Sequence, residues 1–172
     1  MERMRRGYTL SEFHEKVDLI RSLMPEASIT TDIIVGFCGE TEAEFNETLH
    51  LLEEVRFDKV HVAAYSPRPG TIAARKLEDD VPPEVKKERL HRIEELEERI
   101  SSQLNARLEG TDQEVLVEGK RDGRWFGRTR SNKLVHFAGG TSVGEVVSVH
   151  IEKASAWSLQ GTTAADALPL LL

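Results

Sequence analysis

The sequence predicts a chain of two unlike parts, an α/β part followed by a small all-β barrel. Up to residue 108, apolar residues at steps of three and four alternate with short β-branched runs, whereas beyond it apolar and polar residues alternate singly. A length of 172 residues suits one ordinary domain or two small ones. We therefore expect an α/β domain over 1–108, a barrel over 109–163 and a frayed tail over 164–172.

The α/β part is predicted to hold a parallel sheet flanked by helices. Apolar residues on one face favour a helix over 10–24, which Thr9 and Glu12 would begin as a capping box. The run 29–37 is almost continuously apolar or β-branched, which is typical of a strand buried on both faces. The further expected elements are a helix after Thr41, a strand at 59–65, and a long helix from Pro82–Pro83 to about Leu108.

The long helix is expected to turn its charged residues to solvent. Its apolar residues form one seam, which would be the packed face: Val85, Leu90, Ile93, Leu96, Ile100 and Leu104. Two strands and three helices leave a parallel sheet incompletely covered and paired. We expect further βα units from an N-terminal portion to complete it, or alternatively a second chain.

Period-two patterns predict the barrel. The first strand is expected around 114–118, and a turn at Asp122–Gly123 leads to the second. Further strands are expected at 133–137, 146–151 and about 157–160. Five short strands in so few residues favour a small closed barrel.

A basic hairpin marks the barrel as a candidate RNA-binding surface. The stretch 120–133 holds six cations and one anion, although the whole chain has a net charge of −7. Cations beside aromatic rings can meet phosphates and stack on bases. The alternative is a solvated hairpin, and alternation places either Trp125 or Phe126 in the core. The candidate RNA-binding residues are Lys120, Arg121, Arg124, Trp125, Phe126, Arg128, Arg130 and Lys133.

Two loops that follow the strands form a second candidate site. Glycines after a parallel strand let a ligand approach the backbone, and the next helix offers free N–H groups. Prolines stiffen the second loop. The alternatives are an ordinary β–turn–α junction, in which Glu40 and Glu42 only complement the helix dipole, and a rigid turn whose Arg68 pairs with an acid. The candidate pocket residues are Asp32, Gly36, Gly39, Glu40, Tyr65, Ser66 and Arg68.

Composition excludes several other functions. The one cysteine, Cys38, cannot form an internal disulfide framework or a cluster that needs several thiolates. The six histidines lack metal-ligand spacing, and we expect neither a metal site nor a catalytic residue in this chain. No apolar window is long enough to span a membrane. We expect no secretory signal, because no apolar run follows the basic residues at the start of the sequence. We expect a cytoplasmic protein.

Two long motifs resemble the radical S-adenosylmethionine methylthiotransferases. They are Thr31-Asp32-Ile33-Ile34-Val35-Gly36-Phe37-x-Gly39-Glu40-Thr41-Glu42 and Tyr65-Ser66-Pro67-Arg68-Pro69-Gly70-Thr71-x-Ala73-Ala74, and Met4-x-Arg6-x-Tyr8-Thr9 fits as well. Residues 110–162 resemble the TRAM domain, an RNA-binding barrel of OB-like fold. The resemblance implies the C-terminal part of a radical SAM barrel followed by a TRAM domain.

The resemblance also implies a reaction and its cofactors. Arginine and proline after Tyr65-Ser66-Pro67 are typical of the branch that acts on tRNA, adding a 2-methylthio group to N6-isopentenyladenosine beside the anticodon. The family uses S-adenosylmethionine and two 4Fe–4S clusters, whose cysteines lie upstream, so this chain is expected to bind no cluster and to be inactive alone. The implied partner is the tRNA anticodon stem-loop. Cys38 stands where the family usually has proline, so it would restore an N–H and free φ in that turn.

Two alternative functions stay open. The chain could be a stand-alone TRAM module that binds RNA, or it could belong to the sister branch that modifies N6-threonylcarbamoyladenosine in tRNA. A third possibility is an assembly partner whose half-barrel a second chain completes.

Overall fold

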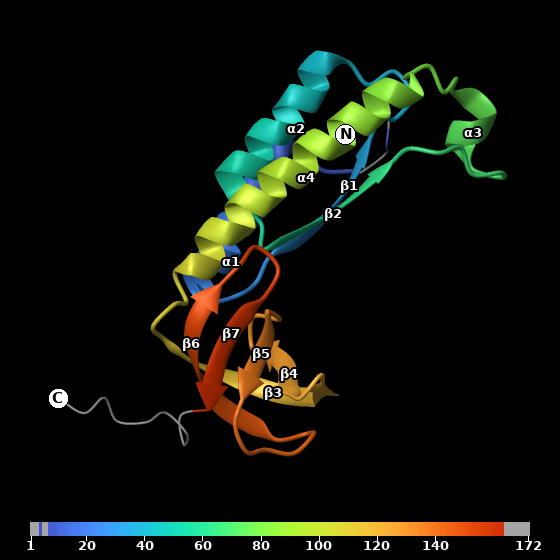
Figure 1. The fold of residues 1–172 in the computed structure, drawn as a ribbon. Helices are drawn as coiled ribbons and strands as arrows, with labels where there is room; N and C mark the ends of the chain where they lie inside the picture. Colours follow the sequence, from blue (N-terminus) through green and yellow to red (C-terminus); the bar gives the residue numbers. More distant parts are fainter. Residues whose placement is uncertain (1–3, 5–6, 164–172) are drawn as a thin grey trace.

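A computed structural model describes residue 4 and residues 7–163 (Figure 1). Arg6 of the sequence motif and the expected frayed tail, 164–172, lie outside the described residues. The α/β part comprises α1 (Leu10–Leu23), β1 (Thr30–Val35), α2 (Glu42–Val55), β2 (Lys59–Ala64), α3 (Ile72–Lys76) and α4 (Pro83–Ala106). The barrel comprises β3 (Asp112–Arg121), β4 (Arg124–Thr129), β5 (Leu134–Ala138), β6 (Val146–Ala154) and β7 (Leu159–Thr163).

The expected helices begin where the sequence signals them. The Thr9 and Thr41 hydroxyls each accept a hydrogen bond from the backbone N–H of the third helical residue, Glu12 or Glu44. The Glu12 and Glu44 carboxylates in turn accept from the backbone N–H of Thr9 and Thr41. These capping boxes satisfy donors that the helix leaves unpaired. The short helix α3 is additional to the expected elements; it follows the proline loop, and Thr71 caps it.

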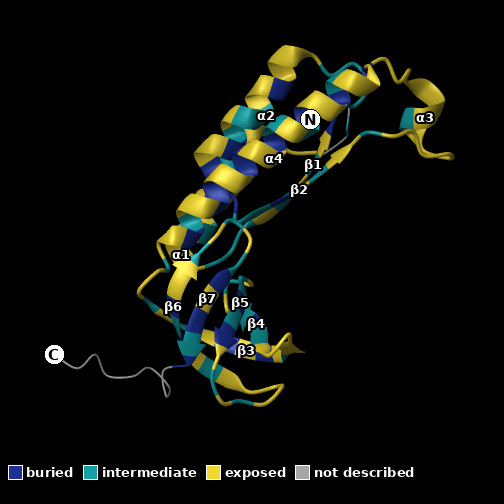
Figure 2. Cartoon of the chain, viewed as in Figure 1, coloured by how far each residue is buried: buried dark blue, intermediate teal, exposed yellow. Residues whose placement is uncertain are grey.

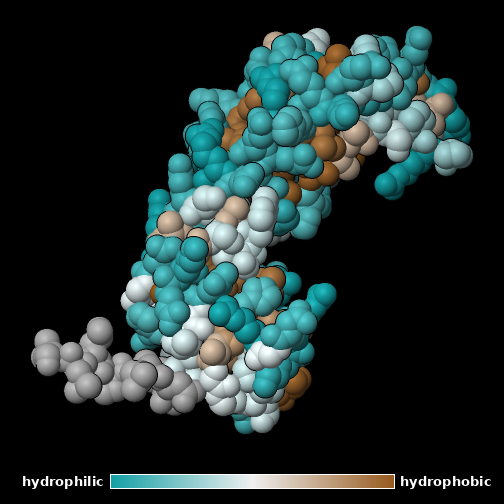
Figure 3. Space-filling view, viewed as in Figure 1, coloured by the Kyte–Doolittle hydropathy of each residue, from teal (hydrophilic) through white to brown (hydrophobic). Residues whose placement is uncertain are grey.

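Strands β1 and β2 form a two-stranded parallel sheet with Ile33 opposite Val62. One face packs against the helices around a core of Val35, Phe45, Leu52, Val60 and Ile93. The other face, which carries Asp32 and Ile34, is exposed, so the prediction that β1 is buried on both faces is wrong for the described chain. Hydrophobic atoms accordingly reach the surface along β1 and β2, beside the hydrophilic outer side of α4 (Figure 3).

The buried face of helix α4 includes charged residues in addition to the expected apolar seam. Ile93, Leu96 and Ile100 are buried as expected. Lys86 and Arg89, which were expected on the solvated face, are also buried, at 7% and 4% exposed. They follow the same three- and four-residue steps as the seam, so the packed face simply continues to the charged N-terminal turns of the helix.

The second part is a closed five-stranded barrel, as predicted, in the order β3-β4-β5-β7-β6. All neighbouring strands are antiparallel except β5 and β7, which are parallel. The last strand runs over 159–163 rather than 157–160. Alternation resolves the two aromatic residues: Trp125 packs against the core and donates from Nε1 to the Gly139 carbonyl at 2.9 Å, so Phe126 faces outward. The core comprises Val115, Val117, Val135, Phe137, Val149, Ile151 and Leu159.

Specific contacts join the two parts. Asn105, near the end of α4, donates from Nδ2 to the carbonyls of Ser155 and Ala156 at 2.8 and 3.1 Å. The Lys59 ammonium lies 4.6 Å from the centre of the Trp157 ring. Lys133 pairs with Asp58 at 3.0 Å. Buried residues run from α4 toward the barrel (Figure 2), so the long helix both covers the sheet and supports the barrel.

No helix within residues 7–163 is both long enough and apolar enough to cross a membrane.

Candidate functional site

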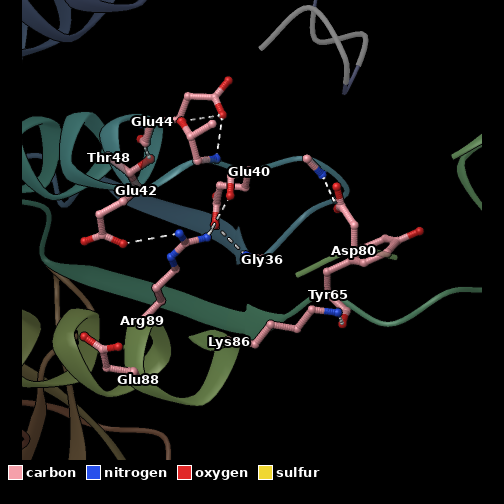
Figure 4. A network of polar contacts seen from close by, with 12 residues as sticks. Gly36, Glu40, Glu42, Glu44, Thr48, Tyr65, Asp80, Lys86, Glu88 and Arg89 are labelled. Carbon is pink, nitrogen blue, oxygen red and sulfur yellow. Dashed lines mark hydrogen bonds and ion pairs between the residues drawn. The ribbon is translucent and has the colours of Figure 1, made fainter. Parts of the chain in front are cut away.

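The loop after β1 is held by the carboxylate of Glu40, one of the loop's own residues. Gly36 adopts φ +69°, a conformation that favours glycine, and its N–H donates to Glu40 Oε2 at 2.6 Å. The Glu40 N–H in turn donates to the Phe37 carbonyl at 2.8 Å. Glu40 thus points back into the turn (Figure 4), and its side chain is only 14% exposed.

Arg89 of α4 neutralises this carboxylate. Its Nη1 lies 2.8 Å from Glu40 Oε2, and its Nη2 lies 3.2 Å from Glu42 on the first turn of α2. The guanidinium also sits 5.2 Å above the Phe45 ring. Its Nε is buried and has no hydrogen-bond partner among the described residues. Because a buried carboxylate is costly without a counter-charge, Arg89 is what allows Glu40 to hold the loop.

Lys86, one turn earlier on α4, ties the two strand-end loops together. Its ammonium donates to the Tyr65 carbonyl at 3.2 Å and pairs with Asp79. Its stem fills the space beside Gly36: a Cβ added at Gly36 would lie 2.3 Å from Lys86 Cγ. The residue at position 36 must therefore be glycine for two reasons, its backbone conformation and this close approach.

Tyr65 packs beside the glycine turn. Its N–H donates to the Val35 carbonyl at 2.8 Å, and its ring meets the Phe37 ring edge-on, with centroids 5.0 Å apart. A hydrogen bond with the Cys38 thiol, helped by burial, raises the pKa of Tyr65 above its ordinary value of 10. Cys38 is 5% exposed. The thiol therefore belongs to the packing between the two loops.

The Gly39 amide and the first turn of α2 also have partners within the chain. The Gly39 N–H donates to Asp80 Oδ1 at 2.6 Å. The first turn of α2 carries Glu42 and Glu44 and the Thr41 capping box, so its dipole is complemented by the chain's own side chains. A phosphate or carboxylate ligand that binds the Gly36 or Gly39 amide would have to displace Glu40 or Asp80.

The structure gathers some of the predicted pocket residues and separates others. Gly36, Glu40 and Tyr65 lie together at the strand ends (Figure 4). Gly39 belongs to the same turn and donates to Asp80. Asp32 lies further back, on the exposed face of β1 opposite His61. Ser66 and Arg68 are exposed in the second loop, and the Arg68 side chain forms no ion pair with a described residue.

Sequence reasoning missed Lys86, Arg89 and Asp80 as members of this cluster. The first two carry a signal, since they fall on the extended seam of α4 at i, i+3 and i+7 with Ile93. Asp80 carries none, because it lies in a loop whose path is fixed only by the fold.

The basic hairpin forms the outer end of the barrel. Lys120 lies 4.9 Å from the centre of the Trp125 ring, and Arg121 and Arg124 are exposed. Arg128 lies 3.7 Å from Glu118, and a hydrogen bond to Glu114 raises the pKa of Arg130. Arg121 lies 3.6 Å from Asp122, so Lys120 and Arg124 are the exposed hairpin cations that form no ion pair within the described residues.

Lys133 is placed differently from the other predicted RNA-binding cations. Its side chain is 14% exposed, and its ammonium lies 3.0 Å from Asp58 Oδ1 in the α/β part. Asp58 Oδ2 also accepts from the Ile29 N–H at 3.0 Å. In this arrangement Lys133 joins the two parts of the chain.

The residues present do not fit an iron–sulfur cluster. Each cluster of the kind that the resemblance implies needs three thiolates, and the chain has one cysteine. Nor do the described residues contain a group of three or more histidine, cysteine or acidic side chains that could hold a metal ion.

Comparisons with known proteins agree with the sequence motifs. Residues 106–164 match the TRAM domain. The chain is 48% identical over 167 residues to the tRNA-2-methylthio-N(6)-dimethylallyladenosine synthase of Chloroflexus aurantiacus, covering 95% of this chain and 36% of that protein. Proteins of the same name from Dehalococcoides mccartyi and a Thermoanaerobacter species are each 48% identical, over 91% and 94% of this chain and 38% and 35% of theirs.

The chain spans about a third of the length of these curated relatives. The match covers nearly all of the chain and so includes both the strand-end loops and the barrel. The resemblance to the methylthiotransferases is thereby confirmed, and the chain carries a TRAM domain.

Proposed function

We propose that this chain forms part of a tRNA methylthiotransferase that adds a 2-methylthio group to N6-isopentenyladenosine beside the anticodon. The observation that carries the proposal is the 48% identity over 95% of the chain to a protein named for this product. The TRAM match and the exposed cations of the β3–β4 hairpin support tRNA as the partner.

Each part of the chain has its own proposed role. Residues 1–108 would form the C-terminal part of a radical SAM barrel, and residues 109–163 would bind the tRNA anticodon stem-loop. The exposed face of β1 and the unpaired outer edges of the two-stranded sheet support a larger barrel, completed by further βα units or by a second chain. A cytoplasmic location follows from the proposed substrate.

The chain's own residues would bind and position rather than react. Asp32, Gly36, Gly39, Glu40, Tyr65, Ser66 and Arg68 are the proposed contacts for S-adenosylmethionine or the target nucleoside. Arg89 would act by fixing the loop, since its guanidinium pairs with the Glu40 carboxylate. The two 4Fe–4S clusters would supply the radical and sulfur chemistry from cysteines outside this chain, so we propose that the chain alone is inactive.

Split complementation tests this function. The chain is expressed in a host that lacks the 2-methylthio modification, either alone or together with the remaining two thirds of the Chloroflexus aurantiacus relative. Nucleosides from total tRNA are then measured by mass spectrometry. We expect 2-methylthio-N6-isopentenyladenosine only in the combined strain. Its failure to form in that strain, with both chains soluble, would contradict the proposal.

The same experiment separates the alternatives. Modification of N6-threonylcarbamoyladenosine instead would assign the chain to the sister branch. If the chain binds tRNA but the combined strain shows no modification, the stand-alone RNA-binding module is favoured. The observation that supports this alternative is the TRAM match.

A further inference from the structure

Four side chains form a row across the outside of the barrel. Strand register pairs Phe126 of β4 with His136 of β5, His136 with Gln160 of β7, and Gln160 with Lys153 of β6. Paired residues on neighbouring strands point to the same side of a sheet. The row thus crosses β4, β5, β7 and β6, which are successive neighbours in the barrel (Figure 1).

The row faces outward, since the residues on either side of its members point into the core. Val135 and Phe137 flank His136, and Leu159 and Gly161 flank Gln160; all four are buried. Gln160 and Lys153 themselves are exposed, and Phe126 and His136 are half-buried. The row is therefore a surface of the barrel with aromatic, imidazole, amide and cationic groups side by side.

The polar groups of the row are unpaired, unlike their neighbours. Within the described chain, His136, Gln160 and Lys153 form no side-chain hydrogen bond or ion pair. Around them the polar side chains are paired: Thr162 donates to Glu152 at 2.9 Å, and His150 lies 2.8 Å from Asp112. Three adjacent unpaired groups on such a surface are available to a ligand.

Gly119 makes room for the aromatic member of the row. It lies opposite Phe126 just after an irregularity in β3, and a Cβ at position 119 would lie 2.8 Å from Phe126 Cζ. The ring therefore rests against the backbone of β3 on the outer surface of the barrel instead of joining the core.

These groups together suit single-stranded RNA. An aromatic ring offers a stacking surface to any base, imidazole and amide groups can hydrogen-bond base edges, and cations meet the backbone phosphates. Strands lie about 4.8 Å apart, so β4 to β7 spans roughly 10 Å, which is within the reach of one or two adjoining nucleotides. Arg124, two residues before Phe126 on the same strand and exposed, adds a cation beside the row.

We propose that the row Phe126–His136–Gln160–Lys153 binds unpaired RNA bases, with Phe126 stacking on one base and His136 and Gln160 hydrogen-bonding base edges. This inference rests on the proposed RNA-binding function of the barrel. It adds three residues outside the basic hairpin, and it makes the barrel selective for looped over duplex RNA.

Fluorescence anisotropy with the full 172-residue chain tests the proposal. The probes are a labelled stem-loop RNA and a labelled blunt duplex with the same number of phosphates. The variants are Phe126→Leu, His136→Ala, Gln160→Ala and, as an electrostatic comparison, Arg124→Gln. His150→Ala is the matched control, because it removes an imidazole from another part of the barrel surface, where it is paired with Asp112. Thermal unfolding confirms that each variant is folded.

We expect Phe126→Leu to weaken stem-loop binding by roughly tenfold, as loss of one stacked base does, and to leave duplex binding unchanged. His136→Ala and Gln160→Ala should weaken stem-loop binding by a few fold each, whereas Arg124→Gln should weaken both RNAs and lower the salt dependence. His150→Ala should change neither.

Two different failures can be told apart. If the wild-type chain binds neither RNA, the proposed RNA-binding function itself is contradicted. If it binds both in a salt-dependent way, and Arg124→Gln weakens binding while the row variants bind as the wild type does, then only the base-binding row is overturned. If Phe126→Leu does not fold, the stem-loop affinities of His136→Ala and Gln160→Ala test the row instead. Wild-type affinity in both would overturn it.

Discussion

Arg89 and Glu40 are 49 residues apart in the sequence, yet they form a 2.8 Å ion pair whose side chains are only 5% and 14% exposed. Glu40 holds the turn after β1 through the Gly36 N–H, and Arg89 lies on α4. The opposite end of the same helix reaches the barrel through Asn105. One helix therefore supports both the strand-end loop and the barrel.

Removing Arg89 should destabilise the chain more than removing an exposed arginine. Arg89→Ala leaves the Glu40 carboxylate buried without its counter-charge, so we expect the free energy of unfolding to fall by about 3 kcal/mol. Urea denaturation measures this change in the free energy of unfolding. Arg99→Ala is the control, because the Arg99–Glu53 pair is more than half exposed on both sides and should cost at most about 0.5 kcal/mol.

The double variant identifies the cause. In a Glu40→Gln background, Arg89→Ala should cost clearly less, because the buried carboxylate is then gone and Glu42, which is more than half exposed, still pairs with Arg92. An equal cost in both backgrounds would show that Arg89 acts through its packing on Phe45 rather than through the ion pair.

Gly36 should tolerate no side chain. In Gly36→Ala the new Cβ meets Lys86 Cγ, and φ +69° is unfavourable for alanine, so we expect a loss of about 3 kcal/mol in unfolding free energy. Gly70→Ala separates the two causes: Gly70 has φ +86° but no atom near the site of the added Cβ, so only the backbone cost of about 1 kcal/mol should appear. Equal losses would argue against the contact with Lys86.

Much of this fold is predictable because its signals are local. The capping residues Thr9 and Thr41 and the alternating strands of the barrel each act within a few residues, and the helices and barrel appear where these signals place them. The choice between Trp125 and Phe126 does not follow from the sequence alone because it depends on strand register, which the irregularity near Gly119 sets.

The cluster at the strand ends was less predictable because its members are distant in sequence. Burial of Lys86 and Arg89 depends on partners in the loops after β1 and β2, and a charged helical residue is by default expected in solvent. The exposed face of β1 was unpredictable for a different reason. The apolar composition of a strand predicts that it is buried, but it does not identify the segment that covers it.

Tyr65 should titrate above its ordinary pKa of 10 because of Cys38. Tyr8→Phe leaves Tyr65 as the chain's one tyrosine, and the ultraviolet absorbance of its phenolate can then be followed against pH. Cys38→Ala should bring the pKa down toward 10. Because the pKa is raised in the folded state, the associated stability is present below pH 10 and is lost as the pH rises past it. An unchanged titration in Cys38→Ala would contradict the hydrogen bond.

Lys133 should matter more for joining the two parts than for binding RNA. Lys133→Met removes the partner of Asp58, which is only 24% exposed, so we expect a loss of about 1 kcal/mol in unfolding free energy and faster hydrogen exchange at the Ile29 amide bonded to Asp58. Lys87→Met, at an exposed position of α4, is the control and should change stability by less than about 0.5 kcal/mol.

Stem-loop RNA affinity should fall less in Lys133→Met than in Arg124→Gln, because the Lys133 ammonium is already paired and its side chain is mostly shielded from solvent. A loss of RNA affinity as large as that of Arg124→Gln, with stability unchanged, would instead assign Lys133 to the RNA-binding surface.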